Sequence, residues 1–167
     1  MKPFREITPA EMGGDVFTRI GKQWMLIGAG DESSHNMMTA SWGGLGVLWN
    51  KPVSTVYIRP SRYTMEFVER EAYYALCFFG EEYREQLTFC GRHSGRDGDK
   101  CAQTGLTPCF EEAAPYFEEA ELVLICRKLY AQDMDPALFL DESIENNYHG
   151  ADYHRVYIGE IVKVLSK

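Results

Sequence analysis

The sequence lacks the features of several protein classes. No apolar run reaches the roughly 18 residues that a membrane-spanning helix requires, and the first residues lead into no apolar stretch. We therefore expect no membrane span and no signal peptide. Basic residues are in the minority, since 17 Lys and Arg stand against 25 Asp and Glu, giving a formal net charge of -8. A nucleic-acid-binding surface needs a basic face, so we expect no nucleic-acid partner.

Paired metal-binding residues are also missing. The five cysteines include no Cys-x-x-Cys pair, and their odd number does not suit a disulfide framework. The four histidines show no i, i+4 spacing, so no metal site is predicted. Reduced thiols are typical of the cytoplasm, and we expect a cytoplasmic protein.

A dinucleotide-binding fingerprint is incomplete. Gly28 and Gly30 fit its first two positions, but Ser33 stands where the third glycine belongs. No helical pattern follows, and the residues about 20 positions further on carry no acid. We therefore reject this motif.

Strand patterns dominate what is present. The runs that read as strands are residues 23–29, 37–42, 53–59, 73–79, 121–132 and 153–165. Shorter helical patterns cover residues 64–71, 81–89, 99–103 and 136–142. In the last strand, one face is expected to carry Val156, Ile158, Val162 and Val164. Because the strands do not alternate with long helices, an antiparallel barrel with a few peripheral helices is favoured. A length of 167 residues suits a single domain, residues 1–167.

The first of two cation-rich segments follows the third expected strand. It reads Arg59-Pro60-Ser61-Arg62-Tyr63-Thr64. Arginines and hydroxyls beside an expected helix start suit a small anion such as phosphate, because unpaired N–H groups favour negative charge there. Ser61 or Thr64 could instead act only as a helix cap. Capping alone leaves the two arginines unexplained.

The second cation-rich segment is residues 90–100. Its glycines at positions 91, 95 and 98 let the backbone approach a ligand closely. Arg92, Arg96 and Lys100 supply donors in different directions. The alternative interpretation is a solvated surface loop with compensating charges.

A third segment carries small hydroxyls. Thr39 and Ser41 are two residues apart, so on a strand they share a face. They suit the polar edge of a flat heterocycle. Trp42 points the other way, and taken alone it is more simply explained as a core residue.

Together these segments resemble the flavin reductase-like family with its FMN-binding split barrel. The resemblance covers the chain from about Gly21 to its C-terminus and follows the pattern of the flavoredoxin-type branch. The matching residues are 38–44, 57–64, 94–97 with Lys100, and 157–161. The resemblance implies a mainly β, antiparallel split barrel and a homodimer that binds FMN non-covalently near its subunit interface.

The resemblance also implies a cofactor site. The first cation-rich segment would surround the FMN phosphate, residues 39–42 would lie along the isoalloxazine edge, and the second segment would approach the phosphate or the ring. The residues so implied are Thr39, Ser41, Trp42, Arg59, Ser61, Arg62, Thr64, Ser94, Arg96 and Lys100. An Arg59→Ala variant is expected to keep the fold and to bind FMN more weakly.

The implied function is an oxidoreductase in which NADH or NADPH passes a hydride to N5 of FMN. No protein residue is expected to be catalytic, because the flavin carries the chemistry. An FMN electron carrier reduced by a partner protein is the alternative, and the acidic composition would suit a basic partner. A non-catalytic module that holds a flavin or another phosphorylated ligand is a third possibility.

Overall fold

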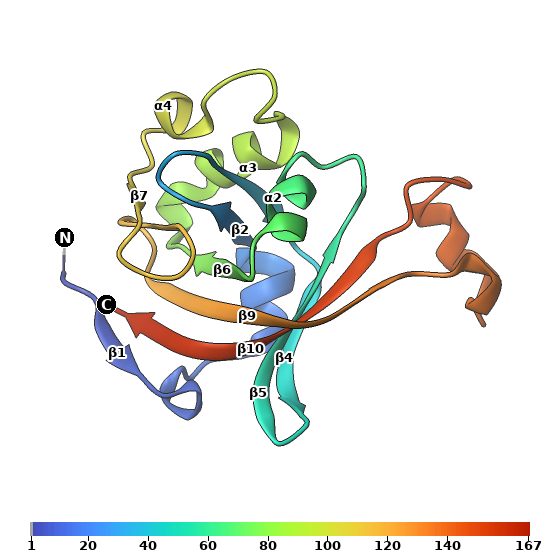
Figure 1. Cartoon of the computed structure of the whole chain (residues 1–167), viewed down its shortest axis with the longest axis horizontal. Coiled ribbons are helices and arrows are strands. Elements are labelled where there is room, and N and C mark those ends of the chain that lie inside the picture. Colours follow the sequence, from blue (N-terminus) through green and yellow to red (C-terminus); the bar gives the residue numbers. More distant parts are fainter. Residues whose placement is uncertain (1) are drawn as a thin grey trace.

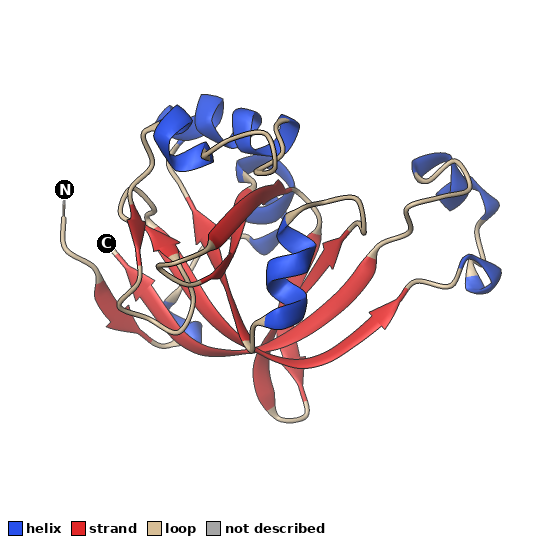
Figure 2. Cartoon of the chain, turned by 45° about the horizontal axis from the view of Figure 1, so that its top comes forward, coloured by secondary structure: helices blue, strands red, loops and turns tan. Residues whose placement is uncertain are grey.

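The computed structural model describes residues 2–167, and its main element is one antiparallel sheet of eight strands (Figures 1 and 2). The strand order is β3-β2-β6-β9-β10-β5-β4, and β1 also pairs with β10. The strands are β1 (Arg5–Ile7), β2 (Met25–Gly30), β3 (His35–Ala40), β4 (Gly43–Leu48), β5 (Lys51–Ile58), β6 (Tyr73–Phe78), β7 (Pro108–Cys109), β8 (Tyr116–Phe117), β9 (Leu122–Asp133) and β10 (Arg155–Ser166). The expectation of a mainly β, antiparallel architecture is confirmed.

The helices are short. They are α1 (Val16–Thr18), α2 (Thr64–Arg70), α3 (Arg84–Arg92) and α4 (Lys100–Thr104). Single 3-10 or π turns occupy Pro9–Glu11, Arg19–Gln23, Glu81–Tyr83, Pro136–Leu138 and Glu142–Asn147. The helix expected at residues 136–142 is therefore wrong, since only 3-10 turns form there. None of the helices in residues 2–167 combines the length and the apolar character that crossing a membrane requires.

Local signals explain where α4 begins and ends. The Asp99 side chain accepts hydrogen bonds from the backbone amides of Cys101 and Ala102, which caps the first turn. Gly105 ends the helix in the left-handed conformation, with φ 73°. This short helix matters because its first residue, Lys100, is held in place by the cap before it.

Strands β2 and β6 and the first five residues of β9 are buried on both faces. In β2, Met25 and Ile27 pack into the barrel interior, while Leu26 packs on the opposite side. That second core lies against α3, α4 and the β7–β8 hairpin (Figure 2). Two-sided burial explains the continuous apolar runs in the sequence. The five cysteines are all free, and only Cys109 is not buried.

Strand β10 departs from simple alternation. Its pairing with β9 shifts register after Ile158 and again after Ile161. The first shift skips Leu129 of β9 and leaves the alternation of β10 intact, whereas the second skips Val162 and changes which β10 side chains point inward. Val162 is therefore 44% exposed, while Val164 is fully buried. The prediction that Val164 shares one face with Val156, Ile158 and Val162 is wrong for this reason.

Two segments of the chain extend away from the barrel (Figure 1). The first is the β4–β5 hairpin, whose two turn residues, Trp49 and Asn50, have φ of 52° and 56°. The second is residues 134–154, here called the arm, which joins β9 to β10. At the base of the arm Asp133 pairs with Arg155 across the two strands, and their side chains form a 2.8 Å ion pair. The arm thus projects from a closed base.

Candidate functional site

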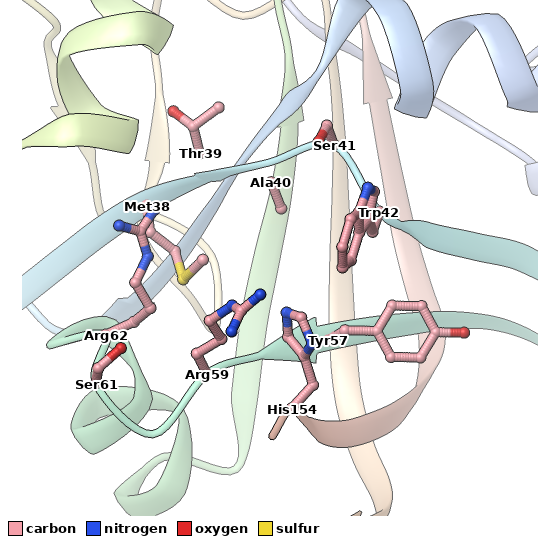
Figure 3. A pocket seen from close by; sticks show the side chains of 10 residues that line it. All are labelled: Met38, Thr39, Ala40, Ser41, Trp42, Tyr57, Arg59, Ser61, Arg62 and His154. Carbon is pink, nitrogen blue, oxygen red and sulfur yellow. The ribbon is translucent and has the colours of Figure 1, made fainter. Parts of the chain in front are cut away.

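Two neighbouring cavities lie beside the ends of β3 and β5. The central cavity has a volume of about 350 Å³ and contains Thr39, Trp42 and Arg59 in its wall (Figure 3). The lysine cavity, of about 110 Å³, contains Lys100. The two cavities share Met38, Ser61 and Arg62. Because these walls are common to both, one extended ligand can occupy both cavities.

The edge of the central cavity is formed where β3 ends. Thr39 lies on β3 and donates a 2.5 Å hydrogen bond to the carbonyl of Leu87 in α3. Ser41 and Trp42 lie in the link from β3 to β4. Trp42 is 47% exposed, so the interpretation of Trp42 as a core residue is wrong. Its ring lies over the cavity, 5.4 Å from the ring of His154.

Lys100 is a buried cation with two carbonyl partners. It is 5% exposed, and Nζ donates to the carbonyls of Met37 (2.8 Å) and Cys90 (2.9 Å). Within residues 2–167, no carboxylate lies within ion-pair distance of this amine. Burial therefore lowers the pKa of Lys100 to about 8, and the nearby Arg62 adds to the effect. A cation held in this way has its charge available for an anion.

Arg62 is the second cation of the lysine cavity. Its Nη1 donates to the carbonyl of Gly91 at 2.8 Å, and it forms no ion pair in the part of the chain that the structure describes. Burial, together with the charge of Arg59, lowers the pKa of its guanidinium, which nonetheless stays charged at neutral pH. Arg62 and Lys100, neither of them in an ion pair within residues 2–167, therefore meet at one small cavity, which Arg92 also lines.

Polar groups from three elements complete this cavity. Thr64 of α2 is 1% exposed and accepts a 2.9 Å hydrogen bond from Asn36 of β3. Ser94 and Gly95 line it from the second cation-rich segment. A Cβ at Gly95 would lie 2.2 Å from the Asn36 side chain, so only glycine lets this loop pack so closely.

Arg59 and Ser61 face the arm. The backbone amide and hydroxyl of Ser61 donate to the carboxylate of Asp152 at 2.9 and 2.6 Å. Arg59 donates to the carbonyl of Asn147 at 2.8 Å and lies over the Tyr148 ring, 5.0 Å from its centroid. Both residues line the central cavity, but their donors are shared with the arm.

Arg96 is the predicted site residue that lies outside both the central and the lysine cavity. It pairs with Glu66 and stacks over Tyr63, 4.6 Å from the ring centroid. It lines neither the central nor the lysine cavity, whereas every other predicted site residue lines one or both. The structure thus brings together residues from positions 39 to 100 and leaves Arg96 in a surface pair.

His154 is a cavity residue that the sequence analysis did not single out. Arg155 pairs with Ile58 across β10 and β5, which places His154 beside Arg59. Its Nδ1 lies 2.7 Å from the Tyr148 hydroxyl. Burial, with Arg59 nearby, lowers the pKa of His154 to about 4, so the ring is neutral at pH 7. Its only sequence signal was its position at the start of the last predicted strand, because the pairing of that strand with β5 is not encoded in the local sequence.

Comparison with known proteins decides the family. The model of the flavin reductase like domain matches residues 17–167. The chain belongs to this family. No curated protein sequence matches it.

Solved structures share the fold of this flavin reductase-like chain. Flavoredoxin from Methanosarcina acetivorans is 23% identical, with a TM-score of 0.69 over 87% of this chain and 68% of that one. An FMN-binding domain of a flavin reductase-like enzyme from Shewanella baltica is 15% identical, with a TM-score of 0.70 over 98% and 77%. A split-barrel protein from Shewanella frigidimarina, described as a flavin reductase, is 24% identical, with a TM-score of 0.69 over 87% and 67%. The fold is therefore the split β-barrel expected from the sequence.

Proposed function

We propose that the protein binds FMN and acts as an oxidoreductase that takes a hydride from NADH or NADPH. The observation that carries the proposal is the pair of cations, Lys100 and Arg62, which share a small cavity without a carboxylate partner. Charge-assisted donors of this kind suit a phosphate. The central cavity beside it suits the flat ring system of a flavin.

The polar groups of the two cavities suit the two ends of FMN, the phosphate and the isoalloxazine ring. Arg62, Lys100 and Thr64 would hold the phosphate, with Ser94 beside them. Thr39, Ser41 and Trp42 would lie along the isoalloxazine. When bound, FMN would supply the redox chemistry, which no side chain here provides. The FMN-binding function named for the Shewanella baltica relative supports this assignment.

The protein's own residues would then bind the FMN and orient its ring system. Trp42 offers a ring face to a flat ligand. His154 is neutral at pH 7, so it serves there as a hydrogen-bonding group and holds no charge. Arg59 would contribute positive potential to the central cavity while it holds the arm.

We extend the proposal to a homodimer formed by a single-domain cytoplasmic chain. Large apolar side chains of the β4–β5 hairpin are exposed, with Val47 at 78% and Trp49 at 54%. Apolar groups gathered at a hairpin tip are typical of an association surface. Sedimentation velocity on the purified protein tests this part of the proposal.

The decisive experiment is an absorbance spectrum followed by anaerobic addition of NADH and, separately, NADPH. Flavin bands that bleach with either nucleotide support the oxidoreductase. Flavin bands that bleach only with dithionite favour an electron carrier reduced by a partner protein, a function to which the net charge of -8 also lends itself. A protein that shows no flavin bands after incubation with FMN contradicts both.

A further inference from the structure

A third cavity adjoins the central one. This apolar cavity has a volume of about 620 Å³, which is within the usual range of small-molecule sites. It shares Ser41, Trp42, Tyr57 and His154 with the central cavity. A molecule bound in it would therefore lie beside whatever occupies the central cavity.

The lining of the apolar cavity carries no charge at neutral pH. No Arg, Lys, Asp or Glu of residues 2–167 lines it. His154 is neutral because burial keeps its pKa at about 4. An ionised group taken from water into such a lining loses its hydration and gains no counter-charge. Phosphates, carboxylates and sulfonates are thus poor occupants.

Aromatic side chains set the shape of the occupant. Trp42 and Tyr57 both line the wall common to the two cavities (Figure 3), and the ring of each lies near the ring of His154. Phe17, from α1, stands at the mouth and is 88% exposed. Ring faces and edges pack best against flat molecules.

One polar pair provides a hydrogen-bonding group next to the wall common to the two cavities. His154 and Tyr148 both line the cavity, and Nδ1 lies 2.7 Å from the tyrosine hydroxyl. When that hydroxyl donates to Nδ1, the ring proton sits on Nε2. Nε2 has no hydrogen-bond partner within residues 2–167. A neutral N–H donor in an apolar wall is suited to a carbonyl oxygen.

We propose that the apolar cavity binds the electron acceptor and that this acceptor is an uncharged, planar quinone. The inference rests on the proposed function, since the electrons come from reduced FMN. Conversion of a quinone to its hydroquinone takes two electrons and two protons. A hydride from the reduced flavin brings both electrons and one proton, and water brings the second proton. His154 would hold the carbonyl oxygen and is not the proton source, because the N–H of a neutral imidazole is a very weak acid.

The test is binding of duroquinone, which is fully methylated, to the purified protein with and without FMN. Equilibrium dialysis is expected to show one saturable site per chain. Durene has the same ring and methyl groups without the carbonyls, and its affinity is expected to be about tenfold weaker, the value of one neutral hydrogen bond. Reduced, FMN-loaded protein is expected to reoxidise anaerobically with duroquinone at a rate that saturates.

A pair of variants locates the site. Phe17→Asp places a carboxylate at the mouth of the apolar cavity and is expected to weaken duroquinone binding about tenfold, with FMN affinity unchanged. Leu140→Asp is the matched control, since Leu140 is fully exposed and lines none of the three cavities. It is expected to change neither affinity.

Each negative result of these experiments overturns a different part of the proposal. No saturable duroquinone binding to a protein that binds FMN overturns the inference and leaves the proposed function standing. Equal affinity for durene overturns the quinone class, and an unaffected Phe17→Asp variant overturns the location. If duroquinone binds but FMN does not, the proposed function fails, and the acceptor role fails with it.

Discussion

Asp152 accepts two hydrogen bonds from Ser61, one from the backbone amide at 2.9 Å and one from the hydroxyl at 2.6 Å. A carboxylate of the arm thus occupies donors of the kind that a phosphate would use. Asp152 holds this position with φ 58°, a conformation uncommon outside glycine. The contact brings a negative charge beside the proposed cofactor site.

Asp152→Asn is expected to tighten FMN binding. The substitution keeps the shape of the side chain and removes a charge that opposes the FMN phosphate. We expect the FMN dissociation constant to fall by about threefold to tenfold, as removal of a screened charge near an anion site implies. Fluorescence titration measures it. Riboflavin, which has no phosphate, is expected to bind equally to both proteins.

The control for this variant is Asp135→Asn. Asp135 caps a turn elsewhere on the arm by accepting from the amide of Ala137. It lines neither the central nor the lysine cavity, so FMN affinity is expected to stay unchanged. Weaker FMN binding by Asp152→Asn would mean that Asp152 supports the site rather than competes with its ligand.

Arg62→Met is expected to weaken FMN binding about tenfold to a hundredfold, the usual worth of a hydrogen bond to a charged group. Arg96→Met removes the same charge from the surface pair with Glu66 and is expected to have a much smaller effect. Isothermal titration of both variants decides between them. Arg59→Ala is a less clean test than the sequence suggests, because Arg59 also holds the arm through Asn147.

FMN affinity is expected to fall as the pH rises above about 8. The pKa of Lys100 in the free protein is about 8, so the amine loses its charge above that pH. A bound phosphate favours the charged form, and binding then takes up a proton, at a limit of about tenfold in affinity per pH unit. Titrations at pH 7 to 9 measure this slope. A Lys100→Met variant that keeps the same slope would contradict the assignment.

Gly159→Ala is expected to destabilise the barrel by about 2 kcal/mol, as overpacking of a tight core does. A Cβ at Gly159 would lie 2.5 Å from the hydroxyl of Tyr74, which is fixed by a 2.7 Å hydrogen bond to Ser54. Gly44→Ala is the control, because nothing lies within 4 Å of the added methyl group. Urea denaturation measures both, and equal stability of the two variants would contradict the expectation.

The fold was predictable where apolar residues dominate. The six predicted strands are present as β2, β3, β5, β6, β9 and β10, with ends displaced by a few residues. β4 was missed because Gly43, Gly44 and Gly46 depress strand propensity. The structure explains one of them: a Cβ at Gly43 would lie 2.9 Å from the carbonyl oxygen of Thr55 in β5.

The site was predictable in part because its cations are gathered in two short segments. The spacing of residues could not predict that Arg96 forms an ion pair with Glu66, which lies four residues before the end of α2. It could not place Asp152 either, since that residue reaches Ser61 across 91 positions. Contacts of that range depend on which strands pair, and no local pattern encodes the pairing of β5 with β10.

The closed base of the arm makes it an exchangeable module. Asp133 and Arg155 hold its entry and exit together as paired strand residues, so its length can change without shifting the sheet. Lys100 of α4 and Arg62, which precedes α2, lie outside the arm, whereas Met134 and Tyr148 reach the apolar cavity from it. On the proposed function, a change in the arm would alter the apolar cavity and the contact of Asp152 with Ser61, while Lys100 and Arg62 would keep their places.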